Sequence, residues 1–230
     1  QYADVMVTAR ELSLDKVKAI TDAIEKYDIR GPGGGKVRIE VFVHGALCMA
    51  VSGKCYLSLD NMNFSANRGE CMQLCRRGYV VRDKETGLEL EVDNEYIMSP
   101  KDLKTIDFLD RILDAGVKVL KIEGRGRSPE YVKTVTRCYR EAVEAYTNGS
   151  FSPERVQHWN EQLAKVYNRG FWGGYYLGRK LGEWSGKYGS QAGTKKIYVG
   201  KVMNYYAKSG VAEVLVEATE LRKGDEIYII

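Results

Sequence analysis

The fold is decided by one stretch of the sequence, Val37-Arg-Ile-Glu-Val-Phe-Val-His44, and by the cysteines that follow it. Its apolar residues recur as they do in a buried strand, so we expect a strand that ends at His44. Four of the five cysteines come directly after this strand, two in Cys48-Met-Ala-Val-Ser-Gly-Lys-Cys55 and two in Cys71-Met-Gln-Leu-Cys75. Four thiols just beyond a strand end indicate a metal or iron–sulfur site rather than simple packing.

Strands and helices alternate on both sides of this stretch. Apolar runs predict strands over 5–9, 96–98 and 117–122, and a hairpin over 80–95. A serine that can cap the following helix stands before each predicted helix, at Ser13, Ser99, Ser128 and Ser152. This alternation predicts an α/β architecture with a parallel sheet.

The composition changes toward the end of the chain. Residues 170–193 are rich in glycine and aromatic residues, which indicates a domain boundary. Short strands are expected after it, over 197–203, 212–218 and 225–230. The pattern therefore predicts an α/β part over 1–193 and a small all-β, barrel-like part over 194–230.

Polar side chains follow three of the predicted strands. Arg10 and Glu11 follow the first strand, His44 ends the second, and Glu123 and Arg125 follow a later one. Because ligand groups gather at the carboxyl ends of parallel strands, these residues are candidates for a common site. His44 can act as a base or a hydrogen-bond donor beside Cys48, although a histidine at a strand end is as often structural.

Charge and composition narrow the class of protein only in part. The chain has 230 residues and a net charge of +4, from 35 basic and 31 acidic residues, which is too mild to name a partner. No apolar run reaches the roughly 20 residues of a membrane-spanning helix, and no secretory signal precedes the first strand. Cysteines without an export signal are typical of a reducing compartment, so we expect a cytoplasmic protein with no membrane partner.

Basic residues gather around the cysteines: Lys54, Arg68, Arg76, Arg77 and Arg82. A basic surface there would suit an anionic substrate, including the phosphates of a nucleic acid. A solvated charged loop is an equal alternative.

The spacing of the cysteines separates the kinds of metal site. Cys48 and Cys55 have six residues between them, and Cys71 and Cys75 have three. Zinc-binding pairs are usually separated by about two to four residues, which fits only the second pair. Iron–sulfur clusters accept more varied spacing, so the pattern favours a cluster over zinc, with unligated cysteines as a third alternative. Cys138 lies on the apolar stripe of a predicted helix and is expected to be buried and free.

Four ordered segments resemble a known family, over nearly the whole chain. They are Arg10-Glu-Leu-Ser-Leu14, Glu40-Val-Phe-Val-His-Gly-Ala-Leu-Cys-Met-Ala-Val-Ser-Gly-Lys-Cys-Tyr-Leu-Ser58, Asn67-Arg-Gly-Glu-Cys71 with Cys75-Arg76, and Lys121-Ile-Glu-Gly-Arg125 with Ser128 and Tyr131. The chain resembles the collagenase-like peptidase family of unassigned catalytic type, and within it the branch that contains the tRNA hydroxylation protein.

The resemblance implies a TIM-like barrel followed by a small β-barrel domain. Residues 1–193 would be the C-terminal part of the TIM-like barrel, with the cysteines in an inserted segment and a helical extension, and 194–230 the start of the β domain. A closed barrel needs about eight strand–helix units, whereas this chain shows three or four. We therefore expect a chain truncated at both ends, with the missing N-terminal half of the barrel in the full protein or in a partner chain.

The resemblance also implies an activity, the hydroxylation of RNA, most directly of a tRNA uridine. It implies a four-iron four-sulfur cluster, with prephenate as the source of the hydroxyl group. The residue roles that go with it are cluster ligation by Cys48, Cys55, Cys71 and Cys75, catalysis by His44, Glu123 and Arg125, cofactor binding by Arg10 and Glu11, and RNA contact by Arg76 and Arg77. Two alternatives stay open: a protease acting on collagen-like or other peptides, and a zinc-stabilised RNA-binding module. No His-Glu-x-x-His motif supports the protease.

Overall fold

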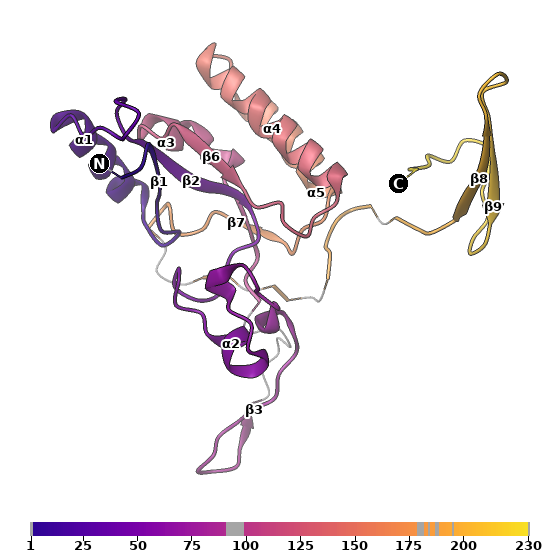
Figure 1. Cartoon of the computed structure of the whole chain (residues 1–230), viewed down its shortest axis with the longest axis horizontal. Helices are drawn as coiled ribbons and strands as arrows, with labels where there is room; N and C mark the ends of the chain where they lie inside the picture. Colours follow the sequence, from indigo (N-terminus) through magenta and orange to yellow (C-terminus); the bar gives the residue numbers. More distant parts are fainter. Residues whose placement is uncertain are drawn as a thin grey trace. The chain divides into compact units, whose positions relative to one another are not determined.

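The computed structural model describes residues 2–90, 99–178, 182–183, 185–186, 189–194 and 196–229 (Figure 1). It divides into two compact units, Gln1–Gly193 and Thr194–Ile230. The boundary between the two units follows Gly193, at the end of the glycine-rich and aromatic stretch over 170–193.

The first unit is built on a mixed sheet whose central strand is β2. The strands of this sheet are β1 (Val5–Val7), β2 (Arg38–Gly45), β5 (Asp102–Lys104), β6 (Val119–Ile122) and β7 (Phe171–Trp172). β1 and β6 run parallel to β2, whereas β5 pairs antiparallel with its last residues and parallel with β7. The expected all-parallel sheet is therefore wrong at β5. Among the described strands the sheet is open, so the closed barrel stays a prediction.

Helices begin where the sequence predicts them at three of the four serine caps. The helices are α1 (Leu14–Lys26), α2 (Leu57–Met62), α3 (Leu109–Asp114), α4 (Pro129–Thr147) and α5 (Pro153–Lys165), with 3₁₀ turns η1 (Ala66–Arg68), η2 (Leu74–Arg76) and η3 (Ile106–Phe108). The hydroxyls of Ser128 and Ser152 accept hydrogen bonds from the amides three residues later, as helix caps do. Ser13 precedes α1 without a side-chain cap bond.

The helix expected after Ser99 is wrong in its first turns. Residues 102–104 form β5, and helical structure begins only at Ile106. Strand pairing explains the difference, because Lys104 lies opposite His44 in β2 and Asp102 lies opposite Phe171 in β7. The local cap signal was overridden by these long-range hydrogen bonds.

One face of β2 carries the core. Ile39, Val41 and Val43 are buried, and they belong to a cluster with apolar residues of α1, α3 and α4, such as Val17 and Val135. Figure 1 shows these helices beside the strands. Glu40 and Phe42 alternate with the buried residues and point to the opposite face, as the period of a strand requires. The two faces of β2 thus differ: the fully buried residues lie on one, and the half-buried Glu40 and Phe42 lie on the other.

The remaining strands are short hairpins. β3 (Val81–Arg82) and β4 (Glu89–Leu90) form the hairpin expected over 80–95, while the strand expected over 96–98 lies outside the described residues. In the second unit β8 (Gly200–Tyr206) and β9 (Val211–Val216) pair antiparallel, and residues 225–229 form no strand. No helix in the described part of the chain is long and apolar enough to cross a membrane.

Candidate functional site

The segment from Cys48 to Cys75, called here the cysteine segment, is held at the carboxyl ends of three strands. Beyond β1, a carboxylate oxygen of Glu11 accepts a hydrogen bond from the amide of Ser52 over 2.9 Å. Beyond β6, the guanidinium of Arg125 donates to the carbonyl of Gly69 over 3.2 Å. The cysteine segment itself begins shortly after the last residue of β2, Gly45. Residues that follow β1 and β6 thus bond the backbone of the cysteine segment, and the common site predicted at the strand ends stays a prediction.

Gly45 lets the chain turn from β2 into this segment. Its φ is +107°, and a side-chain carbon there would lie 2.5 Å from the carbonyl oxygen of Glu123. Only glycine accepts both the positive φ and this close approach. Gly53 and Gly69, within the segment, also have positive φ, so the backbone between the thiols turns at glycines.

The four thiols lie within electrostatic range of one another. All five cysteines are free; Cys48 and Cys71 are exposed, and Cys55 and Cys75 are half-buried. Burial raises the pKa of the Cys75 thiol, the Arg76 guanidinium opposes this, and the charges of the other three thiolates raise the pKa further. Mutual repulsion of this kind is relieved when a positively charged metal centre binds thiolates.

The donor set of four thiolates fits an iron–sulfur cluster. Among the described residues, no three or more His, Cys, Asp or Glu side chains are gathered closely enough to hold a metal ion. The charges of Cys48, Cys55 and Cys71 nevertheless act on the pKa of Cys75, so both cysteine pairs contribute to the electrostatics of this thiol. Cys138, by contrast, is buried on α4, and burial raises its pKa to about 11. It belongs to the core, as expected.

Arg76 and Arg77 differ in their surroundings although they are neighbours. The half-buried guanidinium of Arg76 donates to the carbonyls of Leu47 over 2.6 Å and Pro100 over 2.8 Å, and to the hydroxyl of Ser99 over 2.8 Å. Arg77 is exposed. Of the two predicted RNA contacts, Arg77 has the surroundings of a surface contact, whereas Arg76 ties the two ends of the cysteine segment to the start of β5.

His44 lies in an aromatic environment rather than in a solvent-accessible site. It is 1% exposed, and its ring packs against Tyr131, Tyr139 and Phe171. Its Nδ1 lies 3.3 Å from the hydroxyl of Tyr139. Burial lowers the pKa of His44 to about 3, with help from the charges of Lys104 and Arg127. A neutral, enclosed imidazole favours a structural role, and its predicted catalytic role stays a prediction.

The remaining predicted residues divide between two places. Arg10 lies against Phe42 of β2, with its guanidinium carbon 4.0 Å from the centre of the Phe42 ring. The ammonium of Lys121 lies 5.3 Å from the same ring. Glu123 lies at the end of β6, where a carboxylate oxygen accepts the amide hydrogen of Arg125. Arg10 and Glu123 thus keep positions at strand ends, as predicted, without a shared contact in the described structure.

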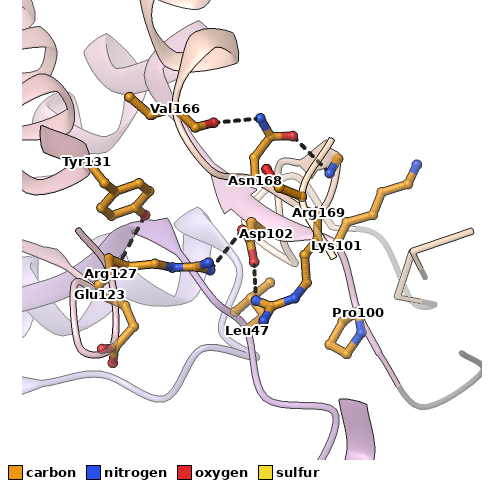
Figure 2. A network of polar contacts seen from close by, with 12 residues as sticks. Leu47, Pro100, Lys101, Asp102, Glu123, Arg127, Tyr131, Val166, Asn168 and Arg169 are labelled. Carbon is orange, nitrogen blue, oxygen red and sulfur yellow. Dashed lines mark hydrogen bonds and ion pairs between the residues drawn. The ribbon is translucent and has the colours of Figure 1, made fainter. Parts of the chain in front are cut away.

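The sequence reasoning missed a cluster of arginines around one carboxylate (Figure 2). Asp102 is 1% exposed, and its two oxygens face two guanidiniums. Arg127 Nη2 lies 3.1 Å from Oδ2, and Arg169 Nη1 lies 3.5 Å from Oδ1. The side chains of these arginines are 6% and 14% exposed. The sequence offers one indication of this cluster, because Arg127 follows the end of a predicted strand. Asp102 offers none, because it resembles the acidic residue in the first turn of a helix.

Arg76 is electrostatically part of this cluster. Burial lowers the pKa of Arg76, the charge of Arg169 lowers it further, and the charges of Cys75 and Asp102 oppose the shift. Arg76 therefore stands between the cysteine segment and the buried charges at β5. We call Arg76, Arg127, Arg169 and Asp102 the arginine cluster.

Four free thiols thus follow the central strand of an α/β sheet, in a segment bonded to residues beyond two neighbouring strands. The chain belongs to peptidase family U32, whose profile matches residues 1–186. It is 62% identical over 229 residues to a protein named collagenase from Porphyromonas gingivalis strain W83, covering 100% of this chain and 55% of that protein. The family predicted from the four ordered segments is thus confirmed.

Relatives named for RNA modification also match. A protein named tRNA hydroxylation protein P1 from Bacillus subtilis is 34% identical over 234 residues, covering 97% of this chain and 51% of that protein. A 23S rRNA 5-hydroxycytidine C2501 synthase from Escherichia coli is 40% identical over 140 residues, covering 61% of this chain and 19% of that protein. The chain thus spans about half the length of the first relatives, or less. No solved structure shows significant similarity to it.

Proposed function

We propose that this chain is part of an RNA-hydroxylating enzyme in which the cysteine segment holds a four-iron four-sulfur cluster. The observation that carries the proposal is the placement of four free thiols in one segment directly after β2, a segment that Glu11 and Arg125 bond from beyond the ends of β1 and β6. Relatives named for tRNA and rRNA hydroxylation support RNA as the substrate class. A tRNA uridine as target, a TIM-like barrel in the whole protein and a cytoplasmic location belong to the same proposal.

The cluster would be held by Cys48, Cys55, Cys71 and Cys75. When bound, it would supply electron-transfer or Lewis-acid chemistry. The chain's own residues position it: Glu11, Arg125 and Arg76 each bond the backbone of the segment or of its flanks. Prephenate remains the proposed hydroxyl donor.

The RNA would approach the exposed side of the cysteine segment. Lys54, Arg68 and Arg77 are exposed there, and they can neutralise phosphates without carrying base specificity. Tyr56 and Tyr79, near these basic residues in the sequence, are also exposed and offer rings on which bases can stack. Basic residues interspersed with aromatic ones are typical of proteins that bind single-stranded nucleic acid.

The proposal is tested with two cysteine substitutions in the full-length protein, purified without oxygen. We expect Cys71→Ser to lose iron, acid-labile sulfide and RNA hydroxylation in a strain that lacks the native protein. Cys138→Ser is the matched control and should retain all three, since Cys138 is buried in the core away from the other thiols. A colourless Cys71→Ser protein that still hydroxylates RNA would contradict the proposal. Zinc without sulfide in the native protein would favour the RNA-binding module instead.

A protease is the second candidate, because the relative with 62% identity is named collagenase. Nucleophilic proteolysis needs a base that can reach a nucleophile. Of the two histidines, His44 is enclosed and neutral, and His158 is exposed on α5. Peptide cleavage by the pure protein that survives iron chelation, and that is lost on Cys48→Ser, would favour this candidate.

A further inference from the structure

The arginine cluster holds more positive than negative charge. Among the described residues, the guanidiniums of Arg127 and Arg169 share one buried carboxylate, that of Asp102, which leaves an excess of one positive charge on these two arginines, while the charges of Cys75 and Asp102 act on Arg76. The carboxylate of Glu123 is the next acidic group near Tyr131. In Figure 2 it points away from Asp102, and it accepts the amide hydrogen of Arg125. Buried charges are costly unless they are paired, so an excess of this kind is expected to have a negative partner.

Arg127 and Arg169 keep donors for such a partner. A guanidinium has five N–H donors, and in the described part of the chain each of these two donates to a single acceptor, an oxygen of Asp102. The 3.5 Å contact of Arg169 is longer than a charge-assisted hydrogen bond of about 2.7–2.9 Å. Arg76 differs, since its donors are occupied by Leu47, Ser99 and Pro100.

The guanidinium planes are already fixed. The Arg127 guanidinium carbon lies 4.1 Å from the ring centre of Tyr167 and 5.3 Å from that of Tyr131. The Arg169 guanidinium carbon lies 5.2 Å from the Tyr167 ring centre. Stacking of this kind leaves the N–H edges free while it holds their direction, so a ligand would not have to order these side chains.

We propose that Arg127 and Arg169 form a binding site for a small oxyanion, with Asp102 holding them in place and Arg76 adding positive potential. The ligand class is a carboxylate or a free phosphate, since both present the paired oxygens that a guanidinium fork binds. An RNA backbone fits less well, because these side chains are only 6% and 14% exposed. That the bound oxyanion serves as a second substrate beside the RNA rests on the proposed function. The binding of the oxyanion to Arg127 and Arg169 does not.

The test is calorimetric titration of the full-length protein with malonate and with inorganic phosphate, at fixed ionic strength. We expect saturable binding of at least one probe, weakened at least about tenfold in Arg169→Gln, which loses a charge-assisted contact. Arg140→Gln is the matched control, because Arg140 is an exposed arginine of α4 that pairs with Glu144. If Arg169→Gln does not fold, Arg127→Gln serves as the second variant, and a rise of the unfolding temperature of the native protein with malonate measures binding without any variant.

Each outcome decides one point. The stronger of the two probes assigns the ligand as carboxylate or phosphate. Equal affinity in Arg140→Gln and Arg169→Gln, or no binding of either probe, would overturn the site. Displacement of malonate by an RNA oligonucleotide would overturn the small-molecule assignment. Intact anion binding in a protein that does not hydroxylate RNA would count against the proposed function and leave this site standing.

Discussion

The guanidinium of Arg76 donates a hydrogen bond to the carbonyl of Leu47 across the base of the cysteine segment, over 2.6 Å. Leu47 immediately precedes the first thiol, and Arg76 immediately follows the last. One side chain thus closes the segment at its base, and through Ser99 and Pro100 it joins that base to the start of β5. The predictions that follow start from this contact and from its neighbours.

Replacing Arg76 by Gln should loosen the cysteine segment. Three hydrogen bonds from a charged donor would be lost, at roughly 1–3 kcal/mol for each bond. We expect faster proteolysis between residues 46 and 80, together with faster loss of iron to a chelator. Arg77→Gln is the control, since Arg77 is exposed; it should keep native proteolysis and iron, and weaken only RNA binding. Equal proteolysis of the two variants would contradict the closing role of Arg76.

Replacing Asp102 by Asn should destabilise the first unit strongly. The substitution leaves Arg127 and Arg169 buried without their counter-ion, and breaking a buried pair in this way costs about 3–5 kcal/mol. The free energy of unfolding in urea measures the effect. Asp22→Asn removes an exposed carboxylate that pairs with Lys18 on α1, and should change stability by less than about 0.5 kcal/mol. A small loss in Asp102→Asn would show that another group balances the arginines.

His44 should make the fold sensitive to mild acid. The pKa of His44 is about 3 in the folded protein against an ordinary value of 6.5, so between these pH values the unfolded chain binds the additional proton. Stability from this residue is fully present above pH 6.5 and falls by about 1.4 kcal/mol per pH unit below it, toward pH 3. The free energy of unfolding, measured from pH 7.5 to 4.5, should fall less steeply in His44→Gln. His158→Gln, at an exposed histidine, should keep the native slope.

Replacing Glu11 by Gln should expose the backbone of the cysteine segment near Ser52. The carboxylate accepts the Ser52 amide hydrogen over 2.9 Å, and a neutral amide oxygen is a weaker acceptor. Hydrogen exchange of the Ser52 amide is therefore expected to accelerate several-fold in Glu11→Gln. Glu70→Gln, at an exposed position inside the same segment, should leave that rate unchanged. Protection that persists in Glu11→Gln would mean that another group holds Ser52.

Sequence reasoning located the site better than it described its surroundings. Glu11 and Arg125 were placed at strand ends by local pattern alone, and both contact the cysteine segment. Ser128 and Ser152 mark helix starts because capping is a local event. The roles of Glu11 in cofactor binding and of Arg125 in catalysis come from the family resemblance, and they remain predictions.

The misreadings share one physical cause. Asp102 resembles the acidic residue of a helix start, yet it lies in β5, where it is paired by strands distant in sequence and neutralises Arg127 and Arg169. Arg169 stands far from both in the chain and carries no local signal. For His44 the sequence left a catalytic and a structural role open, because the aromatic residues that enclose it come from α4 and β7. Contacts between segments distant in the sequence determine the surroundings of all these residues, and the periodicity of apolar residues in a short window does not reveal such contacts.

The way in which the cysteine segment is attached has a consequence for its local stability. Short 3₁₀ turns and one brief helix are its regular elements, and side-chain ties from Glu11 and Arg125 connect it to the sheet. Breaking a few such ties costs far less free energy than separating β2 from its neighbours. Local opening of the segment should therefore need less free energy than unfolding of the sheet, and the amide hydrogens of the segment should exchange with solvent well before those of β2.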